Sequence, residues 1–217
     1  MSTKVWKIIT IIELVAAVIV VLLDLFVPTL VILGMALISL IVRREKPAIL
    51  GLKKSKSWLG MAAIAFLGAV LLQLFDAGVM MPILNRLTGA AIDNSGVAQL
   101  QGNLQQLLIY LVLAWTLAAL GEEIVYRGYL QKLLGDLFGS SLAGVILTIG
   151  ISSMVFGLAH LEQGIVGVIV TTFDGVFYSL LKRKFKGNLW AAILVHGFYN
   201  TVGMVVFYFA GPINGLW

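Results

Sequence analysis

Long apolar stretches, separated by short charged or glycine- and proline-containing segments, constrain this chain more than any other feature. A transmembrane helix needs about 20 predominantly apolar residues, and about seven stretches approach that length. Only 12% of the residues are charged, whereas a soluble domain carries about 25%. We therefore predict an all-α, polytopic transmembrane helix bundle. The predicted spans are residues 5–23, 28–42, 58–81, 104–134, 142–161, 164–181 and 189–210.

The spans form a single membrane domain over residues 1–217. Residues 1–103 hold three N-terminal spans, of which the first two turn back on each other at residues 24–28. They end in a Gln-, Asn- and Gly-rich outer loop, 82–103, in which we expect a short interfacial segment. Residues 104–210 hold a four-span core. The first span is expected to stay uncleaved, because no small-residue cleavage site follows it.

The basic residues indicate which way the bundle faces. With seven spans, nearly all of them fall on one side, which predicts an N-terminus inside the cell. This sidedness also explains the net charge of +5, so the predicted partner is the lipid bilayer and not nucleic acid. The chain has no cysteine, which excludes disulfides and thiolate metal sites. The outer loops carry, in or near them, only Arg86, Asp24, Asp76, Asp93 and Glu162.

Ionisable residues inside spans cost roughly 2.5–3.5 kcal/mol each, so they are functional candidates. The first group is Glu122-Glu123-Ile124-Val125-Tyr126-Arg127 in the fourth span. On a helix Glu123 and Arg127 are one turn apart and can pair. Glu122 points about 100° away from Glu123 and has no local basic partner.

Three further polar sites lie in the later spans. Phe156 and His160 are four residues apart at the end of the fifth span. His196 and Asn200 share one face of the seventh span at the same spacing. These two histidines are the only ones in the chain. We expect Asp174, in the sixth span, to hydrogen-bond within the bundle without taking part in catalysis.

The polar residues are expected to converge. If the fourth and fifth spans form a hairpin near residues 139–140, Glu122 and His160 lie at nearly the same height, ~25–30 Å from the turn at 1.5 Å per residue. His196 and Asn200 lie ~14–20 Å above a turn near Gly187 by the same rise. Helix tilt and side-chain reach are large enough to bring the two levels together.

A carboxylate and a histidine around one water molecule can deprotonate it for attack on a carbonyl. A second histidine and an asparagine can donate hydrogen bonds to the developing oxyanion. The chain has no cysteine, no G-x-S-x-G elbow and no H-E-x-x-H zinc helix. No cofactor is favoured, although a divalent metal such as zinc, held by Glu122, His160 and His196, stays an alternative.

The chain thus carries three motifs in order on its C-terminal helices, Glu122-Glu123-x-x-x-Arg127, Phe156-x-x-x-His160 and His196-x-x-x-Asn200. Together they resemble the CPBP family of membrane proteins. That family includes CAAX prenyl endopeptidases, bacteriocin-processing proteases and the Abi proteins. The resemblance covers about residues 107–209, and the first three spans carry no motif. It implies that Glu122 activates water with help from His160, and that His196 and Asn200 stabilise the oxyanion. The supporting residues it implies are Glu123 and Arg127, as an ion pair, and Phe156, which lines the site.

The predicted function is therefore that of an intramembrane endopeptidase in a bacterial cell membrane. Its substrate would be a membrane-associated or secreted peptide, which need not be prenylated. The alternative is a non-proteolytic protein on the same fold, such as a bacteriocin-immunity or membrane binding protein. A transporter is disfavoured, because transporters often show repeated halves and no internal repeat stands out here.

Overall fold

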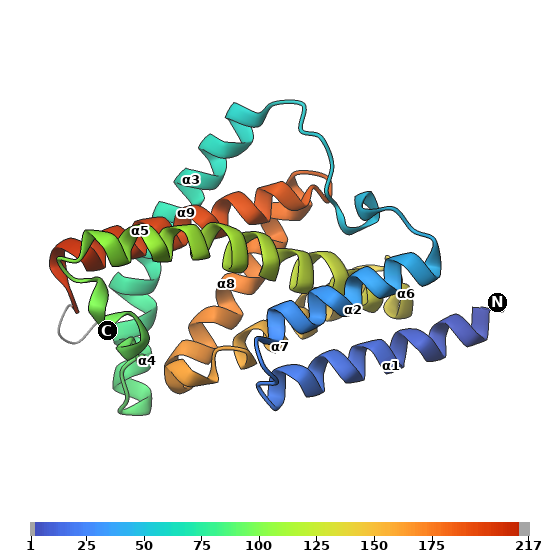
Figure 1. Cartoon of the computed structure of the whole chain (residues 1–217), viewed down its shortest axis with the longest axis horizontal. Helices are drawn as coiled ribbons and strands as arrows, with labels where there is room; N and C mark the ends of the chain where they lie inside the picture. The colour runs from blue at the N-terminus through green and yellow to red at the C-terminus, as the bar shows by residue number, and fades with distance from the viewer. Residues whose placement is uncertain (1–2, 213–217) are drawn as a thin grey trace.

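The computed structural model describes residues 3–212, and every regular element in that part of the chain is helical. Short 3₁₀ turns lie at Pro47–Leu50, Ser95–Leu100 and Leu161–Gln163. The α-helices are α1 (Thr3–Leu22), α2 (Pro28–Arg43), α3 (Trp58–Phe75), α4 (Met81–Thr88), α5 (Leu104–Leu113), α6 (Gln131–Phe138), α7 (Leu142–Leu158), α8 (Gly164–Lys184) and α9 (Leu189–Ala210). Figure 1 shows an elongated bundle in which α1, α5 and α9 run along the long axis, while α3, α4 and α8 cross it.

Two π-helical segments join α-helices into longer rods. Asp76–Met80 connects α3 to α4, and Ala114–Leu130, which we call η4, connects α5 to α6. Five of the resulting helices are long and apolar enough to cross a membrane. The other two predicted spans are the apolar helices α2 and α7, of 16 and 17 residues. The predicted polytopic helical bundle is confirmed.

The outer end of the third span differs from its prediction. We predicted a span that ends at Met81 and a loop from Pro82, but the helix continues to Thr88. Pro82 lies in the first turn of α4, where its missing N–H leaves no intrahelical bond unmade. The N–H of Met81 meanwhile bonds to the carbonyl of Asp76, five residues back. The proline therefore starts a new helical segment without ending the rod.

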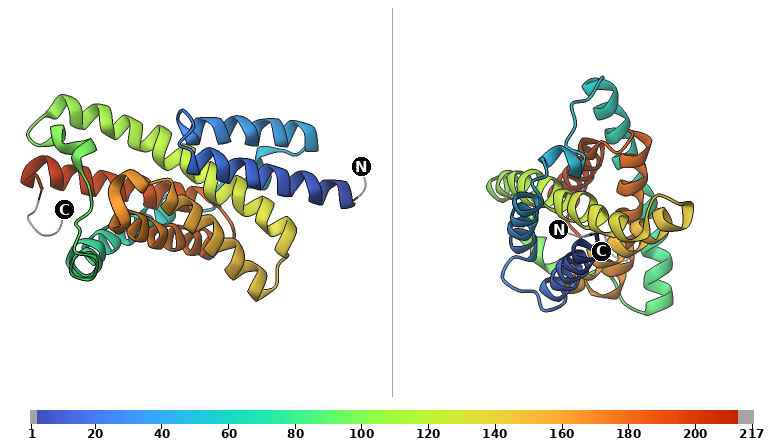
Figure 2. Two further views of the ribbon diagram at one scale, coloured as in Figure 1. Left: turned by 90° about the horizontal axis from the view of Figure 1, so that it is seen from below. Right: turned by 90° about the vertical axis from the view of Figure 1, so that its right-hand side faces the viewer.

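The first two helices form the expected hairpin, and they lie side by side in both Figures 1 and 2. Arg43, at the end of α2, fastens it. Its guanidinium donates to Glu13 at 2.6 Å and to Thr10 at 3.0 Å, both on α1. The same guanidinium bonds to Ser39 one turn back. These bonds hold the ends of the two helices together.

The core that positions the site is built by η4, α7, α8 and α9. Helix α7 packs along α8, and α9 packs against α3, η4 and α8. Buried aromatic side chains fill the centre, among them Tyr126, Phe156 and Tyr178. The bundle thus surrounds the η4 segment, which carries the two adjacent glutamates, with apolar and aromatic surface.

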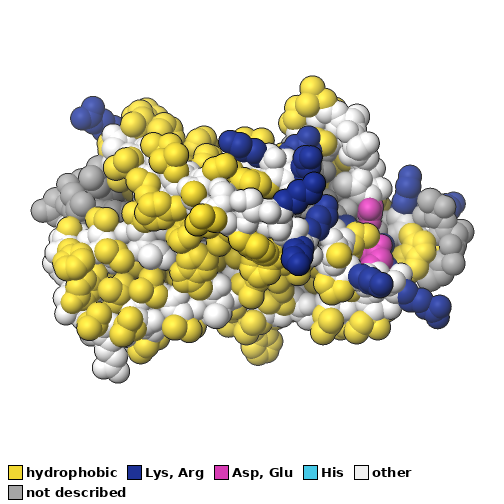
Figure 3. All heavy atoms as spheres, turned by 90° about the horizontal axis from the view of Figure 1, so that it is seen from above, with side chains coloured by type: hydrophobic (Ala, Val, Ile, Leu, Met, Phe, Trp, Pro, Cys, Tyr) yellow, Lys and Arg dark blue, Asp and Glu magenta, His cyan; other side chains and the backbone are white. Residues whose placement is uncertain are grey.

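Basic side chains are unevenly distributed over the surface. On the face drawn in Figure 3 they gather mostly over one half of the molecule, and most of the rest of that face is apolar. The basic last turn of α8, with Lys182, Arg183 and Lys184, lies well short of the N-terminal end of the long axis in Figure 1. The orientation with the N-terminus inside stays a prediction.

Close packing of α7 on α8 leads to a stability prediction at Gly157. A Cβ there would lie 2.6 Å from the carbonyl oxygen of Val168 and would overlap Thr172 Oγ1. Because overpacking a tight contact costs about 1–3 kcal/mol, Gly157→Ala should lower the thermal unfolding midpoint in detergent. Gly150 lies on the same helix with open space around it, and Gly150→Ala should leave the midpoint equal or higher. Equal losses in both variants would contradict this packing.

Candidate active site

The two adjacent glutamates lie in the π-helical segment η4, and such segments occur frequently at functional sites. The Arg127 guanidinium donates to Glu123 Oε1 at 2.9 Å, so these residues pair as their spacing predicts. Both side chains are completely buried. A buried pair of this kind is retained only where its charges compensate each other, because desolvation of each charge is expensive.

Aromatic rings enclose the Arg127 guanidinium. Its central carbon lies 4.0 Å from the centre of the Phe156 ring and 5.3 Å from that of Tyr178. Cation–π contacts of this type stabilise a desolvated guanidinium. Gly175 on α8 provides the necessary space, because a Cβ at that position would lie 2.7 Å from Arg127 Nη2.

His196 lies between the two glutamates. Its Nδ1 is 2.9 Å from Glu123 Oε1, the oxygen that also accepts from Arg127. Because a carboxylate paired with arginine accepts hydrogen bonds, Nδ1 carries a proton and donates it. The opposite nitrogen, Nε2, faces Glu122 Oε2 at 4.0 Å. Tyr178 stacks on the imidazole with ring centres 5.0 Å apart, which fixes the plane of the ring.

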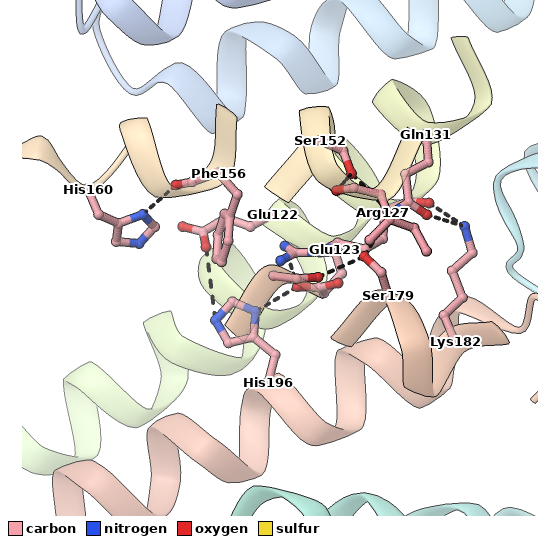
Figure 4. Close-up of polar contacts among 12 residues, drawn as sticks. Glu122, Glu123, Arg127, Gln131, Ser152, Phe156, His160, Ser179, Lys182 and His196 are labelled. Carbon is pink, nitrogen blue, oxygen red and sulfur yellow. Dashed lines mark hydrogen bonds and ion pairs between the residues drawn. The ribbon is translucent and has the colours of Figure 1, made fainter. Parts of the chain in front are cut away.

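Glu122 is the less constrained carboxylate. Its side chain is 17% exposed, and its buried Oε2 has no hydrogen-bond partner in the described chain. The 4.0 Å separation from His196 is longer than a direct hydrogen bond. In Figure 4 the carboxylate points towards the region between the two imidazole rings. Glu122 is therefore available to a bound molecule, in contrast to its neighbour Glu123.

His160 lies just beyond the end of α7. Its Nδ1 is 2.9 Å from the Phe156 carbonyl oxygen, which can only accept, so Nδ1 donates and Nε2 is left free. The Phe156 ring contacts both imidazoles, with centres 4.9 Å from His160 and 5.9 Å from His196. Phe156 thus joins the two histidines as part of one aromatic group.

A cavity of about 180 Å³ lies beside these side chains. His160, His196 and Asn200 all line it, and Asn94 from the loop before α5 lines it from the outer side. Glu122 does not line it but faces His196 at its edge. The expected convergence is therefore present, and His196 reaches the level of the glutamates. The sequence had placed His196 and Asn200 several ångströms lower than Glu122. That estimate assumed an α-helical rise through residues 114–130, which are π-helical.

Some site residues were not identified from the sequence. Asp76 was placed near an outer loop, but it is completely buried, and its Oδ2 accepts from the Tyr199 hydroxyl at 2.8 Å. The sequence did contain a signal for Asp76, because an ionisable residue within an apolar stretch indicates a buried polar site. Tyr178, which stacks on His196, carried no signal in the sequence, because an aromatic residue in a span is ordinary core.

A polar network supports the inner side of the site, as the right of Figure 4 shows. The Gln131 amide donates to Ser152 at 3.1 Å and to Ser179 at 2.8 Å. Lys182 donates to the carbonyl oxygen of Arg127 and to the amide oxygen of Gln131. These bonds tie α7 and α8 to the end of η4 and hold the backbone that carries the ion pair.

The three side chains considered as metal ligands do not form a ligand set. Across residues 3–212, no group of three His, Cys, Asp or Glu side chains is arranged to hold a metal ion. The Nδ1 protons of both histidines are donated to oxygen atoms, which leaves Nε2 of each ring facing the site. This orientation of Nε2 suits a proton acceptor and equally a metal ligand, whose other ring nitrogen usually donates to a carboxylate or a backbone carbonyl.

The fold defines a multi-pass helical membrane protein in which the predicted catalytic glutamate, histidine and asparagine residues lie close together, His196 buried and the others partly exposed. Residues 104–202 match the family described as type II CAAX prenyl endopeptidase Rce1-like, which is a protease family. The predicted resemblance to the CPBP and CAAX protease family is confirmed over these residues. All of the motif residues fall within the matched segment.

A protein of Mycoplasma capricolum subsp. capricolum, described as uncharacterized, is 32% identical to this chain over 101 residues. The aligned part is 46% of this chain and 28% of that protein. The chain thus spans less than a third of the length of this relative. No solved structure matches the chain.

Proposed function

We propose that this protein is an intramembrane endopeptidase that hydrolyses a peptide bond of a membrane-associated or secreted peptide. The observation that carries the proposal is the Glu122 carboxylate, whose Oε2 has no hydrogen-bond partner in the described chain and faces His196 inside the segment that matches the CAAX protease family. A buried carboxylate oxygen without a hydrogen bond is costly to keep. Its retention is explained if it acts on water and substrate.

Glu122 and His160 are the proposed water-activating groups. Two hydrogen bonds of about 2.8 Å that meet near a right angle span the 4.0 Å between Glu122 and His196, so a water molecule fits between these groups. Glu122 takes one proton of that water as its oxygen attacks the substrate carbonyl. The free Nε2 of His160 can accept a second hydrogen bond from the same water and so orient it.

His196 and Asn200 are the proposed oxyanion donors. Asn200 follows His196 by one helical turn on α9, and both side chains line the cavity. For His196 to donate from Nε2 while Nδ1 donates to Glu123, the ring must be doubly protonated. The carboxylates on its two sides supply the countercharge. Donors aimed at the position where charge develops lower the barrier to attack.

The activity is tested with purified protein reconstituted in lipid vesicles and a mixed-sequence library of internally quenched peptides. We expect wild-type protein to release internal fragments, which mass spectrometry identifies, at a preferred position in the sequence. Peptide that binds to the vesicle-embedded protein but stays intact would instead favour the non-proteolytic alternative. If the protein neither binds nor cleaves any peptide, the result counts against the peptidase and against the non-proteolytic binding protein.

Metal removal distinguishes the two ways of holding the water. Since the described residues offer no three-ligand group, we propose a carboxylate-held water. We expect 1,10-phenanthroline and EDTA to change cleavage less than twofold, and elemental analysis to find far less than one metal ion per chain. Stoichiometric zinc that is lost together with activity, and restored with it, would overturn the metal-free site.

A further inference from the structure

A second pair of carboxyl groups lies in the same bundle. Asp76, in the π-helical turn after α3, and Asp174, on α8, are neighbouring carboxyl groups that both lie beside Tyr199. Asp76 is completely buried and Asp174 is 4% exposed. Two adjacent carboxyl groups in a buried site cannot both stay ionised, because like charges repel and burial disfavours charge. We therefore infer that the pair holds one proton.

The surroundings of the pair favour one shared proton. Tyr199 donates its hydroxyl to Asp76 Oδ2 at 2.8 Å. The remaining oxygens, Oδ1 of Asp76 and Oδ1 of Asp174, have no other donor among the described residues. Two like charges in contact in a buried site cannot both stay ionised. The other titratable groups beside the pair are Tyr178 and Arg127, whose guanidinium pairs with Glu123.

This pair has access to the reaction site. Asp174 lines the cavity that His160, His196 and Asn200 also line. It lies one helical turn, about 5.4 Å, from Tyr178, whose ring stacks on His196. Asp76 lies behind it and is not in the cavity wall. The shared proton is thus held at the cavity surface by Asp174, at a different place from Glu122.

We propose that the Asp76–Asp174 pair is a second acid of this site, and that it protonates the leaving amine when the peptide bond breaks. This inference rests on the proposed peptidase function. Water adds to the carbonyl carbon and gives its proton to Glu122. As the C–N bond of the tetrahedral intermediate breaks, the amine nitrogen takes the shared proton from Asp174. The pair then regains a proton from water, and Glu122 releases its own, so protons balance over a cycle.

The chemistry explains why a second acid is useful. An amine is a poor leaving group unless it is protonated, and a positioned acid contributes about 10²–10⁴-fold. A thiolate leaves without a proton, because a thiol has a pKa near 8.5. A thioester analogue, in which sulfur replaces the scissile nitrogen of the same peptide, therefore needs the water-activating groups and not the second acid.

The test compares the best peptide from the library with its thioester analogue. We expect Asp174→Asn to lower kcat on the peptide by about 100-fold or more and on the thioester by less than about fivefold. Glu122→Gln should impair both substrates. Asp136→Asn is the matched control, since Asp136 pairs with Lys132 at the other end of the bundle, and it should impair neither.

Each outcome decides the inference. If Asp174→Asn lowers turnover of both substrates equally, or of neither, the proposal of a second acid is wrong. Peptide cleavage by the wild-type protein would in that case still support the peptidase function. No cleavage of either substrate by wild-type protein would reject the peptidase itself. If Asp174→Asn does not fold, Tyr199→Phe decides, because it keeps both carboxyls but removes the donor to Asp76. We expect it to lower the ratio of peptide to thioester turnover, and an unchanged ratio would overturn the proposal.

Discussion

Replacing Glu122 with glutamine is expected to lower kcat/KM for peptide cleavage by about 10²–10⁴-fold, the contribution of a positioned general base. Glutamine has nearly the same shape but cannot take a proton from water. The substitution removes no hydrogen bond of Oε2, which has no such partner in the described chain, and changes only its 4.0 Å contact with His196. Activity should therefore be lost while the thermal unfolding midpoint changes little. Initial rates in lipid vesicles measure the first effect, and circular dichroism in detergent measures the second.

A matched substitution separates this effect from a general loss of charge. Glu45 lies outside the site, where its carboxylate pairs with Lys132 at 3.2 Å and is partly exposed. An exposed pair of this kind is worth about 0–1 kcal/mol, so Glu45→Gln should keep full activity. If purified Glu122→Gln protein cleaves peptide at the wild-type rate, Glu122 is not the general base and the proposed reaction centre is wrong.

Hydropathy was sufficient to predict the helices, because lipid requires each crossing segment to satisfy its own backbone hydrogen bonds. The ends of α9 followed for the same reason, because it begins and ends with its apolar run. The end of the third span did not, since the helix continues through Pro82 to Thr88. That continuation and the π-helical hydrogen bonds of η4 depend on local packing that hydropathy does not encode.

Only those contacts of the site that lie within one helix could be predicted from the sequence. The Glu123–Arg127 pair is local, since helix spacing alone places the two side chains on one face. The contact between His196 and Glu123 joins residues 73 positions apart, so it depends on how α9 packs against η4. Asp76 was missed because its position near a predicted span end suggested exposure, whereas α8 and α9 bury it through Asp174 and Tyr199.

The shared oxygen of Glu123 connects the stability of the bundle to its chemistry. Glu123 Oε1 accepts from Arg127 and from His196, each at 2.9 Å. The carboxylate pairs with the arginine and accepts from Nδ1 of His196, so that Nε2 of the imidazole points to Glu122. A change at Arg127 should therefore affect both the fold and the position of the imidazole.

Arg127→Met should be the most destabilising of these substitutions, because it leaves Glu123 without its countercharge in a site that is closed to water. Removing one partner of a buried pair costs about 3–5 kcal/mol, and the thermal unfolding midpoint in detergent should fall accordingly. Arg183→Met on α8 is the matched control, because Arg183 is exposed and its loss should leave the midpoint nearly unchanged. A similar fall in both variants would mean that the side-chain pair is not the cause.

The double variant Glu123→Gln/Arg127→Met separates stability from catalysis. With both charges gone, no uncompensated ion is left in the core, and replacing a whole buried pair is often close to neutral for stability. The unfolding midpoint should therefore recover most of the loss seen in Arg127→Met. Peptide cleavage should stay low, because the carboxylate that accepts from Nδ1 of His196 and orients its ring is gone. Recovery of activity together with stability would show that the ion pair supports only the fold.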